Sequence, residues 1–208
     1  MTTTGGSRPR LLVATRSEHK LRELRQLLAL PNAELVTLDD VGVHGEPVED
    51  GETFEANAAI KARAGLAASG LPTLADDSGL EVDALGGAPG VRTRRYAGED
   101  ATDEQNNAKL LAALDAVPAE GRGAHYVCSL VLAMPGEPLI TVRGECFGRI
   151  ATGPRGHRGF GYDPIFEPEG EAPGGRTFGQ WSADDKNRVS HRARAARAMT
   201  PFLIERGF

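Results

Sequence analysis

Patterns typical of strands and of helices alternate along this chain, and this alternation restricts its fold more than any other feature. The apolar run 11–14 predicts a short buried strand, which leads into the polar segment 15–20. Leucines then recur at helical spacing from 21 to 28, before Pro31 stops the helix. The N-terminal part of the chain is therefore expected to run from a strand through a polar loop into a helix.

The alternation continues along the rest of the chain. A helix capped by Thr53 precedes two short strands, the first ending near Ala75 and the second containing Leu80 and Val82. Because helices interleave with strands at both ends while strands fill the middle, we expect an α/β fold with a mixed sheet. The remaining expected elements are long strands at 126–134 and 139–150, a helix at 102–116, a short helix after Ser182, and a last helix at 191–205 capped by Ser190.

The length and composition fit a globular chain with a proper core. We expect one domain at 11–208 and a flexible tail at 1–10, because the tail is small, polar and basic and lacks the apolar segment of a signal peptide. No stretch approaches the ~20 apolar residues of a membrane span. The two cysteines lie in apolar runs and are expected to be buried structural thiols. These features predict a cytoplasmic protein that does not enter a membrane.

The net charge of −5 bears on the class of ligand. A protein that binds a nucleic acid polymer needs a basic face to displace counterions, so this charge argues against such a partner. A small anionic ligand stays possible, because a divalent cation and a few well-placed lysines or arginines can hold phosphates locally.

The acidic segment Asp76-Asp77-Ser78-Gly79 follows an apolar strand and is the first candidate for chemistry. Carboxylates suit Mg²⁺, which prefers oxygen ligands and keeps waters for substrate phosphates. Adjacent strand residues point to opposite faces, so both carboxylates reach one metal only if the strand breaks into a turn at Ser78-Gly79. An acidic turn with hydrogen bonds to its own backbone is an equally good interpretation. Glu49, in the acidic segment before Thr53, is our candidate for a further metal ligand.

Two other segments could bind an anionic or aromatic ligand. The loop 15–20 places backbone N–H groups and Lys20 at a helix N-terminus, which suits phosphates, although a simple capped helix start is the commoner explanation. In 159–164, glycines beside aromatic residues would let a flat ring stack, and Asp163 could accept a hydrogen bond from a ribose or base, although a plain turn with core aromatics is an alternative. Near the C-terminus, Lys186 precedes the pair His191-Arg192, which lies in the first turn of the last helix, where the dipole disfavours cations. The three residues suggest an anionic or carbonyl-rich ligand, although a solvated basic face is an alternative.

Together these segments resemble the inosine triphosphate pyrophosphatase family, whose members hydrolyse non-standard purine nucleoside triphosphates. The resemblance extends from Leu11 to about Met199. Its most specific parts are LADDSGLEVDALGGAPGVRTRRYAGEDATD at 74–103, GFGYDPIF at 159–166 and DDKNRVSHR at 184–192.

The resemblance implies a fold, an activity and a set of site residues. The fold would be a two-lobed mixed α/β fold with the active site in the cleft, usually in a homodimer. The activity would be Mg²⁺-dependent hydrolysis of free ITP, dITP and XTP to the monophosphate and pyrophosphate. Asp77 would be catalytic and would ligate the metal, with Glu49 as our choice of second ligand. The implied substrate-binding residues are Thr15, Arg16, Ser17, Glu18, His19, Lys20 and Ser78 near the phosphates, and Phe160, Gly161, Tyr162, Asp163, Lys186, His191 and Arg192 around the nucleoside.

Two positions depart from the family pattern. Ser17 stands where an asparagine is usual, and Ala56 stands where a glutamate is usual. The serine loses an amide group, and the alanine can neither complete a helix capping box nor ligate a metal. These departures leave open a nucleotide-sensing protein without turnover. Among enzymes, the alternative is a related pyrophosphatase that acts on other modified nucleotides such as pyrimidines.

Overall fold

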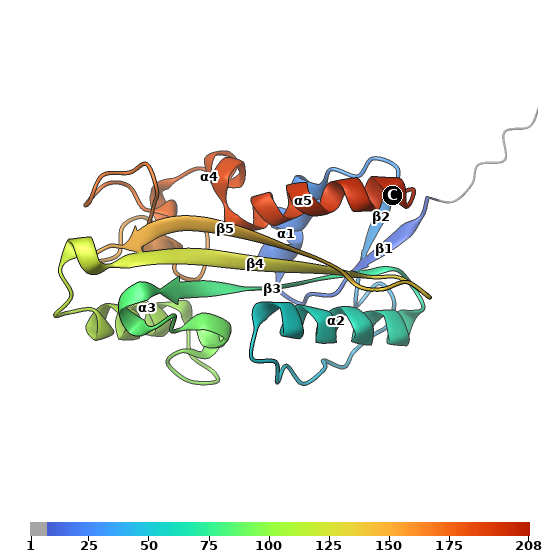
Figure 1. Cartoon of the computed structure of the whole chain (residues 1–208), viewed down its shortest axis with the longest axis horizontal. Helices are drawn as coiled ribbons and strands as arrows, with labels where there is room; N and C mark the ends of the chain where they lie inside the picture. The colour runs from blue at the N-terminus through green and yellow to red at the C-terminus, as the bar shows by residue number, and fades with distance from the viewer. Residues whose placement is uncertain (1–7) are drawn as a thin grey trace, which may run out of the picture.

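The computed structural model describes residues 8–208 and contains one six-stranded mixed sheet in the order β2-β1-β3-β4-β5-β6. β1 pairs in parallel with β2 and β3, and the other neighbours are antiparallel (Figure 1). The mixed α/β sheet is thus confirmed. The strands are β1 (Arg10–Val13), β2 (Glu34–Thr37), β3 (Thr73–Val82), β4 (Gly123–Ala133), β5 (Ile140–Ile150) and β6 (Phe166–Pro168).

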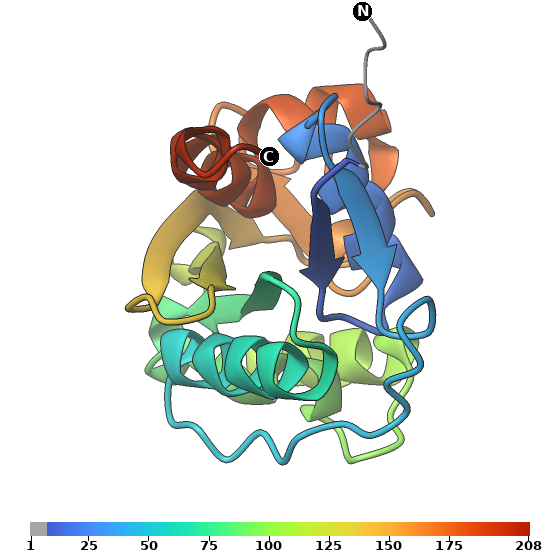
Figure 2. The ribbon, with the colours of Figure 1, turned by 90° about the vertical axis from the view of Figure 1, so that its right-hand side faces the viewer.

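Helices cover both faces of the sheet. α1 (Glu18–Leu28) and α5 (His191–Glu205) lie on one face, and α2 (Phe54–Ser69) lies on the other (Figures 1 and 2). α3 (Asp103–Ala113) packs at the far end of β3 and β4, and α4 (Ala183–Val189) leads directly into α5. The expected helices are confirmed. Within residues 8–208, no helix combines the length and the apolar composition that crossing a bilayer requires.

Alternation along the strands divides the core between these faces. Leu11 and Val13 of β1 pack with α1 and α5, whereas Leu12 packs with α2. The same alternation on β3 sends Leu74 to the α1–α5 face and Ala75 to the α2 face. Successive residues of β3 therefore contribute to two different layers.

β3 differs from the sequence-based expectation at the acidic segment. The predicted turn at Ser78-Gly79 is wrong, because β3 is one continuous strand whose antiparallel register with β4 runs without interruption from Thr73 to Val82. Gly79 has a packing role instead. A Cβ atom there would lie 2.7 Å from both the carbonyl oxygen of Gly90 and the ring of Phe54, closer than such atoms approach. Asp76 and Asp77 therefore point to opposite faces and cannot ligate one metal together.

The path of β1 creates an opening beside β3. β1 pairs with β3 only at its last residues, Leu12 with Thr73 and Val13 with Leu74. Beyond that point β3 continues while β1 turns into the loop 15–17. An open sheet offers a ligand crevice beyond the carboxyl ends of its parallel strands. Of the predicted N-terminal tail, residues 1–7 lie outside the described part of the chain, and Arg10 already belongs to β1.

Candidate active site

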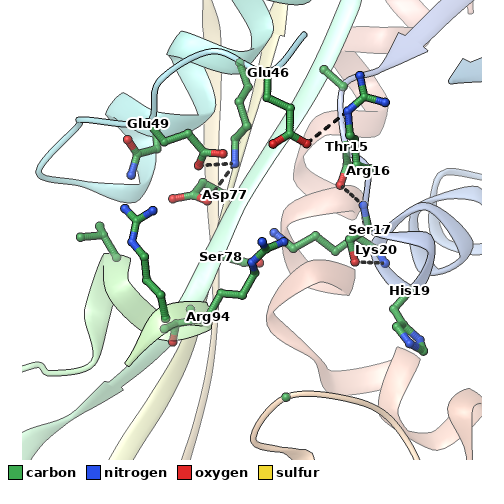
Figure 3. Close-up of a pocket in the computed structure, with 18 of the residues that line it drawn as sticks. Thr15, Arg16, Ser17, His19, Lys20, Glu46, Glu49, Asp77, Ser78 and Arg94 are labelled. Carbon is green, nitrogen blue, oxygen red and sulfur yellow. Dashed lines mark hydrogen bonds and ion pairs between the residues drawn. The ribbon is translucent and has the colours of Figure 1, made fainter. Parts of the chain in front are cut away.

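A cavity of about 1060 Å³ lies at this opening, between the loop after β1, one side of α2 and the 3₁₀ segment η2 (Gly90–Arg95) (Figure 3). Most of the residues predicted to form the site line it. Glu18, which is exposed, and Lys186, which is buried, do not line the cavity. The predicted residues on its walls are Thr15, Arg16, Ser17, His19, Lys20, Glu49, Asp77, Ser78, Phe160, Gly161, Tyr162, Asp163, His191 and Arg192.

Two carboxylates converge on one lysine in this cavity. The Nζ atom of Lys61 lies 2.9 Å from Oδ1 of Asp77 and 3.0 Å from Oε2 of Glu49. Lys61 belongs to α2, on the face of the sheet to which Asp77 points, whereas Glu49 comes from the loop before that helix. The lysine therefore brings together two acids that are far apart in the sequence.

Burial changes the protonation of this group. It raises the pKa of Asp77 above its ordinary value, although the nearby Lys61 ammonium opposes the change. Burial alone would lower the pKa of Lys61, but the carboxylates of Asp77, Asp76 and Glu49 raise it above its ordinary value. The pair thus consists of a lysine that stays charged and an aspartate that binds a proton more readily than an exposed one.

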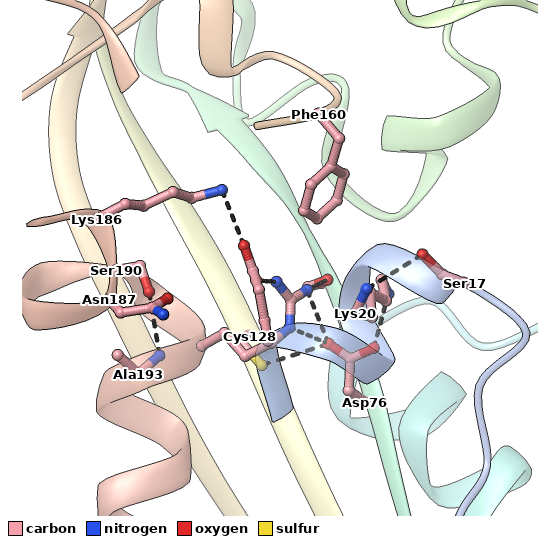
Figure 4. A network of polar contacts seen from close by, with 12 residues as sticks. Ser17, Lys20, Asp76, Cys128, Phe160, Lys186, Asn187, Ser190 and Ala193 are labelled. Carbon is pink, nitrogen blue, oxygen red and sulfur yellow. Dashed lines mark hydrogen bonds and ion pairs between the residues drawn. The ribbon is translucent and has the colours of Figure 1, made fainter. Parts of the chain in front are cut away.

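Asp76 has a different environment on the other face of β3 (Figure 4). Its carboxylate lies 2.8 Å from Nζ of Lys20 and 3.0 Å from Nη2 of Arg192. Burial would raise the pKa of Asp76, but Lys20 and Arg192 hold it well below its usual range. Nη2 of Arg192 also donates to the hydroxyl of Ser78, at 2.8 Å. Asp76 therefore fixes the two cations and is not a free metal ligand.

The loop 15–17 is held by its own side chains. The hydroxyl of Ser17 caps α1 by accepting from the backbone N–H of Lys20, and the N–H of Ser17 donates to Oγ1 of Thr15. The serine that departs from the family pattern thus still provides a helix cap. Arg16 does not point freely at the cavity, because it pairs with Asp39 and Glu46 and donates to the carbonyl of Val43. Arg16 ties this loop to the segment that carries Glu49.

Aromatic rings form another wall of the cavity. The ring of Phe160 stacks on His19 with centroids 5.1 Å apart, and His191 stacks on Tyr126 at 4.7 Å. Burial holds the pKa of His191 well below its ordinary value, and Arg192 reinforces the effect, so the imidazole is neutral. A flat ring can stack at this wall, with one neutral N–H donor beside it.

Asp163 and Lys186 form a buried pair behind this wall. Nζ of Lys186 lies 2.6 Å from Oδ2 of Asp163, which also accepts from the backbone N–H of Phe160, at 3.0 Å. The hydroxyl of Tyr126 donates to the other oxygen of Asp163. Both predicted nucleoside contacts are thus engaged within the protein, where they position the loop that carries Phe160.

Sequence reasoning missed two charged residues of the site. Lys61 is one of only three charged residues of α2, a helix made mostly of alanine and other small residues, and this isolation was a usable signal. Glu23 lies on α1, where it contacts Arg192 and accepts from Lys186 at 3.2 Å. It looks like any acid on an amphipathic helix, so the sequence offers no comparable signal for it.

The carboxylates of Asp77 and Glu49 suit a divalent cation. Mg²⁺ commonly binds through one or two protein carboxylates and completes its octahedron with waters and substrate phosphates. Across residues 8–208, no group of three or more acidic, histidine or cysteine side chains gathers into a closed metal cage. Two carboxylates on the wall of an open cavity fit a cation that is shared with a phosphate ligand.

The chain is similar in sequence and in fold to known proteins. A family model described as Ham1 family matches residues 11–202. The chain is 52% identical over 185 residues to a dITP/XTP pyrophosphatase of Syntrophobacter fumaroxidans, covering 89% of this chain and 78% of the relative. It is 49% identical to a dITP/XTP pyrophosphatase of Nocardia farcinica, covering 93% and 94% of the two chains.

Solved structures of similar proteins have the same fold. A HAM1 protein from Coxiella burnetii superposes with a TM-score of 0.85 at 37% identity, covering 95% of this chain and 99% of that one. A nucleoside-triphosphatase, described as a dITP/XTP pyrophosphatase, from Mycobacterium abscessus gives a TM-score of 0.76 at 46% identity, covering 92% and 99%. The mixed-sheet fold expected from the sequence is therefore shared with these proteins.

Proposed function

The chain belongs to the Ham1 family, and from this premise we propose that it hydrolyses dITP, ITP and XTP to the monophosphate and pyrophosphate. One structural observation about the site supports this proposal. Asp77 and Glu49 converge on Lys61 in a cavity that also contains a helix N-terminus and an aromatic wall. Such a cavity offers separate places for a metal-bound polyphosphate and for a base.

We propose that Mg²⁺ is held by Asp77 and Glu49. When bound, it would neutralise phosphate charge and lower the pKa of a bound water. The convergence of two carboxylates on the cavity wall supports this assignment, whereas Asp76 does not line the cavity and is enclosed by Lys20 and Arg192.

The chemical step that these residues suit is an in-line displacement at the α-phosphorus. Asp77 would accept a proton from the attacking water as the new O–P bond forms, and its raised pKa makes it a better base than an exposed aspartate. The bond between the α-phosphorus and the bridging oxygen would break, and pyrophosphate would leave with the electron pair. Lys61 and the N-terminus of α1 would stabilise negative charge on the phosphate oxygens.

Base selection would follow from hydrogen-bond polarity. Hypoxanthine and xanthine carry a carbonyl at C6, which can accept a hydrogen bond from His191 or Arg192 while the ring stacks on Phe160. Adenine presents an amino group there, so a buried donor would face another donor and remain unpaired.

We also propose that the protein acts in the cytoplasm, as a homodimer, on free nucleotides rather than on a nucleic acid polymer. The net charge of −5 supports the choice of free nucleotides. The dimer and the location rest on the resemblance and on the composition described above.

Pyrophosphate release from a panel of nucleoside triphosphates, with and without Mg²⁺, tests the proposed function. We expect dITP, ITP and XTP to exceed ATP, GTP and modified pyrimidine nucleotides in kcat/KM, and EDTA to abolish release. Comparable turnover of ATP would contradict the base assignment. Binding of dITP without any release would support a nucleotide sensor, and preference for a modified pyrimidine nucleotide would support the other alternative.

A further inference from the structure

The cations that line the cavity differ in whether an acid already neutralises them. Lys61 pairs with Asp77 and Glu49, and Lys20 pairs with Asp76. Arg192 and Arg16 each pair with two carboxylates, and Arg95 lies 3.9 Å from an oxygen of Glu99. Acidic side chains of the protein therefore already neutralise most of the cations that line the cavity.

Two arginines of η2 are exceptions. Among residues 8–208, no acidic side chain forms an ion pair with Arg92 or Arg94, although both line the cavity. Arg92 also borders a second groove with Glu52 and Glu55, so its charge is shared between two sites. Arg94 borders only the main cavity and not the second groove. Its side chain extends into the main cavity in Figure 3.

The backbone beneath Arg94 is firmly anchored although its side chain is not. Oγ1 of Thr93 accepts from the N–H of Leu80 in β3 at 2.8 Å, and the carbonyl of Thr93 accepts from the hydroxyl of Tyr162 at 2.8 Å. The carbonyl of Arg94 itself accepts from Nδ2 of Asn106 in α3, at 2.9 Å. The segment therefore presents an unpaired guanidinium from a fixed support.

We propose that Arg94 binds the polyphosphate of the substrate, from the η2 wall of the cavity and apart from the loop 15–20. The guanidinium offers a planar set of donors that matches phosphate oxygens in a bidentate manner. A triphosphate carries several negative charges, and Arg94 is a lining cation that pairs with no acid among residues 8–208 and borders no second groove. This inference rests on the proposed function, in which the ligand is a nucleoside triphosphate.

Calorimetric titration with inorganic tripolyphosphate in the presence of Mg²⁺ tests the contact without any turnover. We expect Arg94→Ala and Arg94→Gln to weaken tripolyphosphate binding by about 10- to 100-fold, the range for one hydrogen-bonded charged contact. Arg94→Lys should retain part of the affinity, because it keeps the charge but loses the bidentate geometry. The matched control is Arg63→Ala, which removes an exposed arginine of α2 that does not line the cavity.

The outcomes separate this inference from the proposed function. Loss of tripolyphosphate binding in both neutral variants, with wild-type affinity in Arg63→Ala, supports the role of Arg94 even if dITP proves not to be a substrate. If the wild type hydrolyses dITP but Arg94→Ala binds tripolyphosphate as tightly as Arg63→Ala does, the inference is wrong while the proposed function stands. Failure of the wild-type protein to bind tripolyphosphate would also overturn the inference about Arg94.

Discussion

Asp76 and Asp77 are neighbours in the chain, yet their carboxylates lie on opposite faces of β3 and face different lysines. Asp76 lies 2.8 Å from Nζ of Lys20 beside α1, and Asp77 lies 2.9 Å from Nζ of Lys61 in α2. Because the strand is continuous, alternation alone separates them. Folding lowers the pKa of Asp76 and raises that of Asp77. Substitution by asparagine should therefore affect the free energy of unfolding differently at the two positions.

The first prediction concerns stability. Asp76→Asn should reduce the free energy of unfolding at pH 7 by about 3 kcal/mol or more, because it removes one partner of a buried ion pair and leaves cations uncompensated. Asp77→Asn should leave stability unchanged or slightly higher, because burial disfavours its charged form. Urea denaturation of both variants measures this difference. Equal destabilisation by the two substitutions would contradict the assignment.

The pH dependence of stability is a separate prediction. The folded-state pKa of Asp76 lies below its unfolded value of about 3.9, so the stabilisation is present above that value and is lost as the pH falls further. The wild type should therefore lose stability below about pH 4 more steeply than Asp76→Asn does. Denaturation midpoints measured from pH 6 to pH 2.5 test this, and parallel curves for the two proteins would contradict it.

The pH dependence of activity should report on Asp77. Asp77 of the metal-free protein has a raised pKa, so protons compete with Mg²⁺ for this carboxylate, and activity should fall on the acidic side at a higher pH than an ordinary aspartate would cause. Lys61→Met removes the cation that opposes this rise, so the acidic limb of kcat/KM should move to still higher pH. A profile of kcat/KM against pH for wild type and variant measures the shift. An unmoved or lowered limb in the variant would exclude direct coupling between the two residues.

Glu49 gives a prediction about metal use. Glu49→Gln should raise the Mg²⁺ concentration needed for half-maximal activity by about tenfold or more, a size seen when even the partners of metal ligands are substituted. Glu99→Gln is the matched control, because Glu99 lines the same cavity but on the side of Arg95. Equal metal requirements in the two variants would remove Glu49 from the metal site.

The elements with strong local patterns could be predicted from the sequence. The last helix begins at His191 and ends at Glu205 as expected, because Ser190 is a clear N-cap. β2 and β6 could not be predicted, since these strands of 4 and 3 residues lack the continuous apolar run that identifies β1. The continuity of β3 was hidden by Asp76-Asp77-Ser78-Gly79, whose composition is typical of a turn. Tertiary packing against Phe54 and pairing with β4 overrule that local preference.

The residues that line the site could largely be predicted from the sequence, but the ion pairs between them could not. The residues expected to surround the ligand mostly do line one cavity, since motifs place them at the ends of strands and helices. Which cation neutralises which acid depends on contacts between elements distant in sequence, such as Lys61 with Glu49 and Lys186 with Glu23. Such contacts leave no local pattern in a single sequence.

The most direct test of the account is pyrophosphate release from dITP by Asp77→Asn with saturating Mg²⁺, measured beside the wild type. We predict a loss of kcat of at least about 10²-fold, the lower end of what a general base contributes, with an unchanged midpoint of thermal unfolding. Turnover near the wild-type rate in a folded Asp77→Asn protein would contradict the central claim that Asp77 is the general base of this cavity.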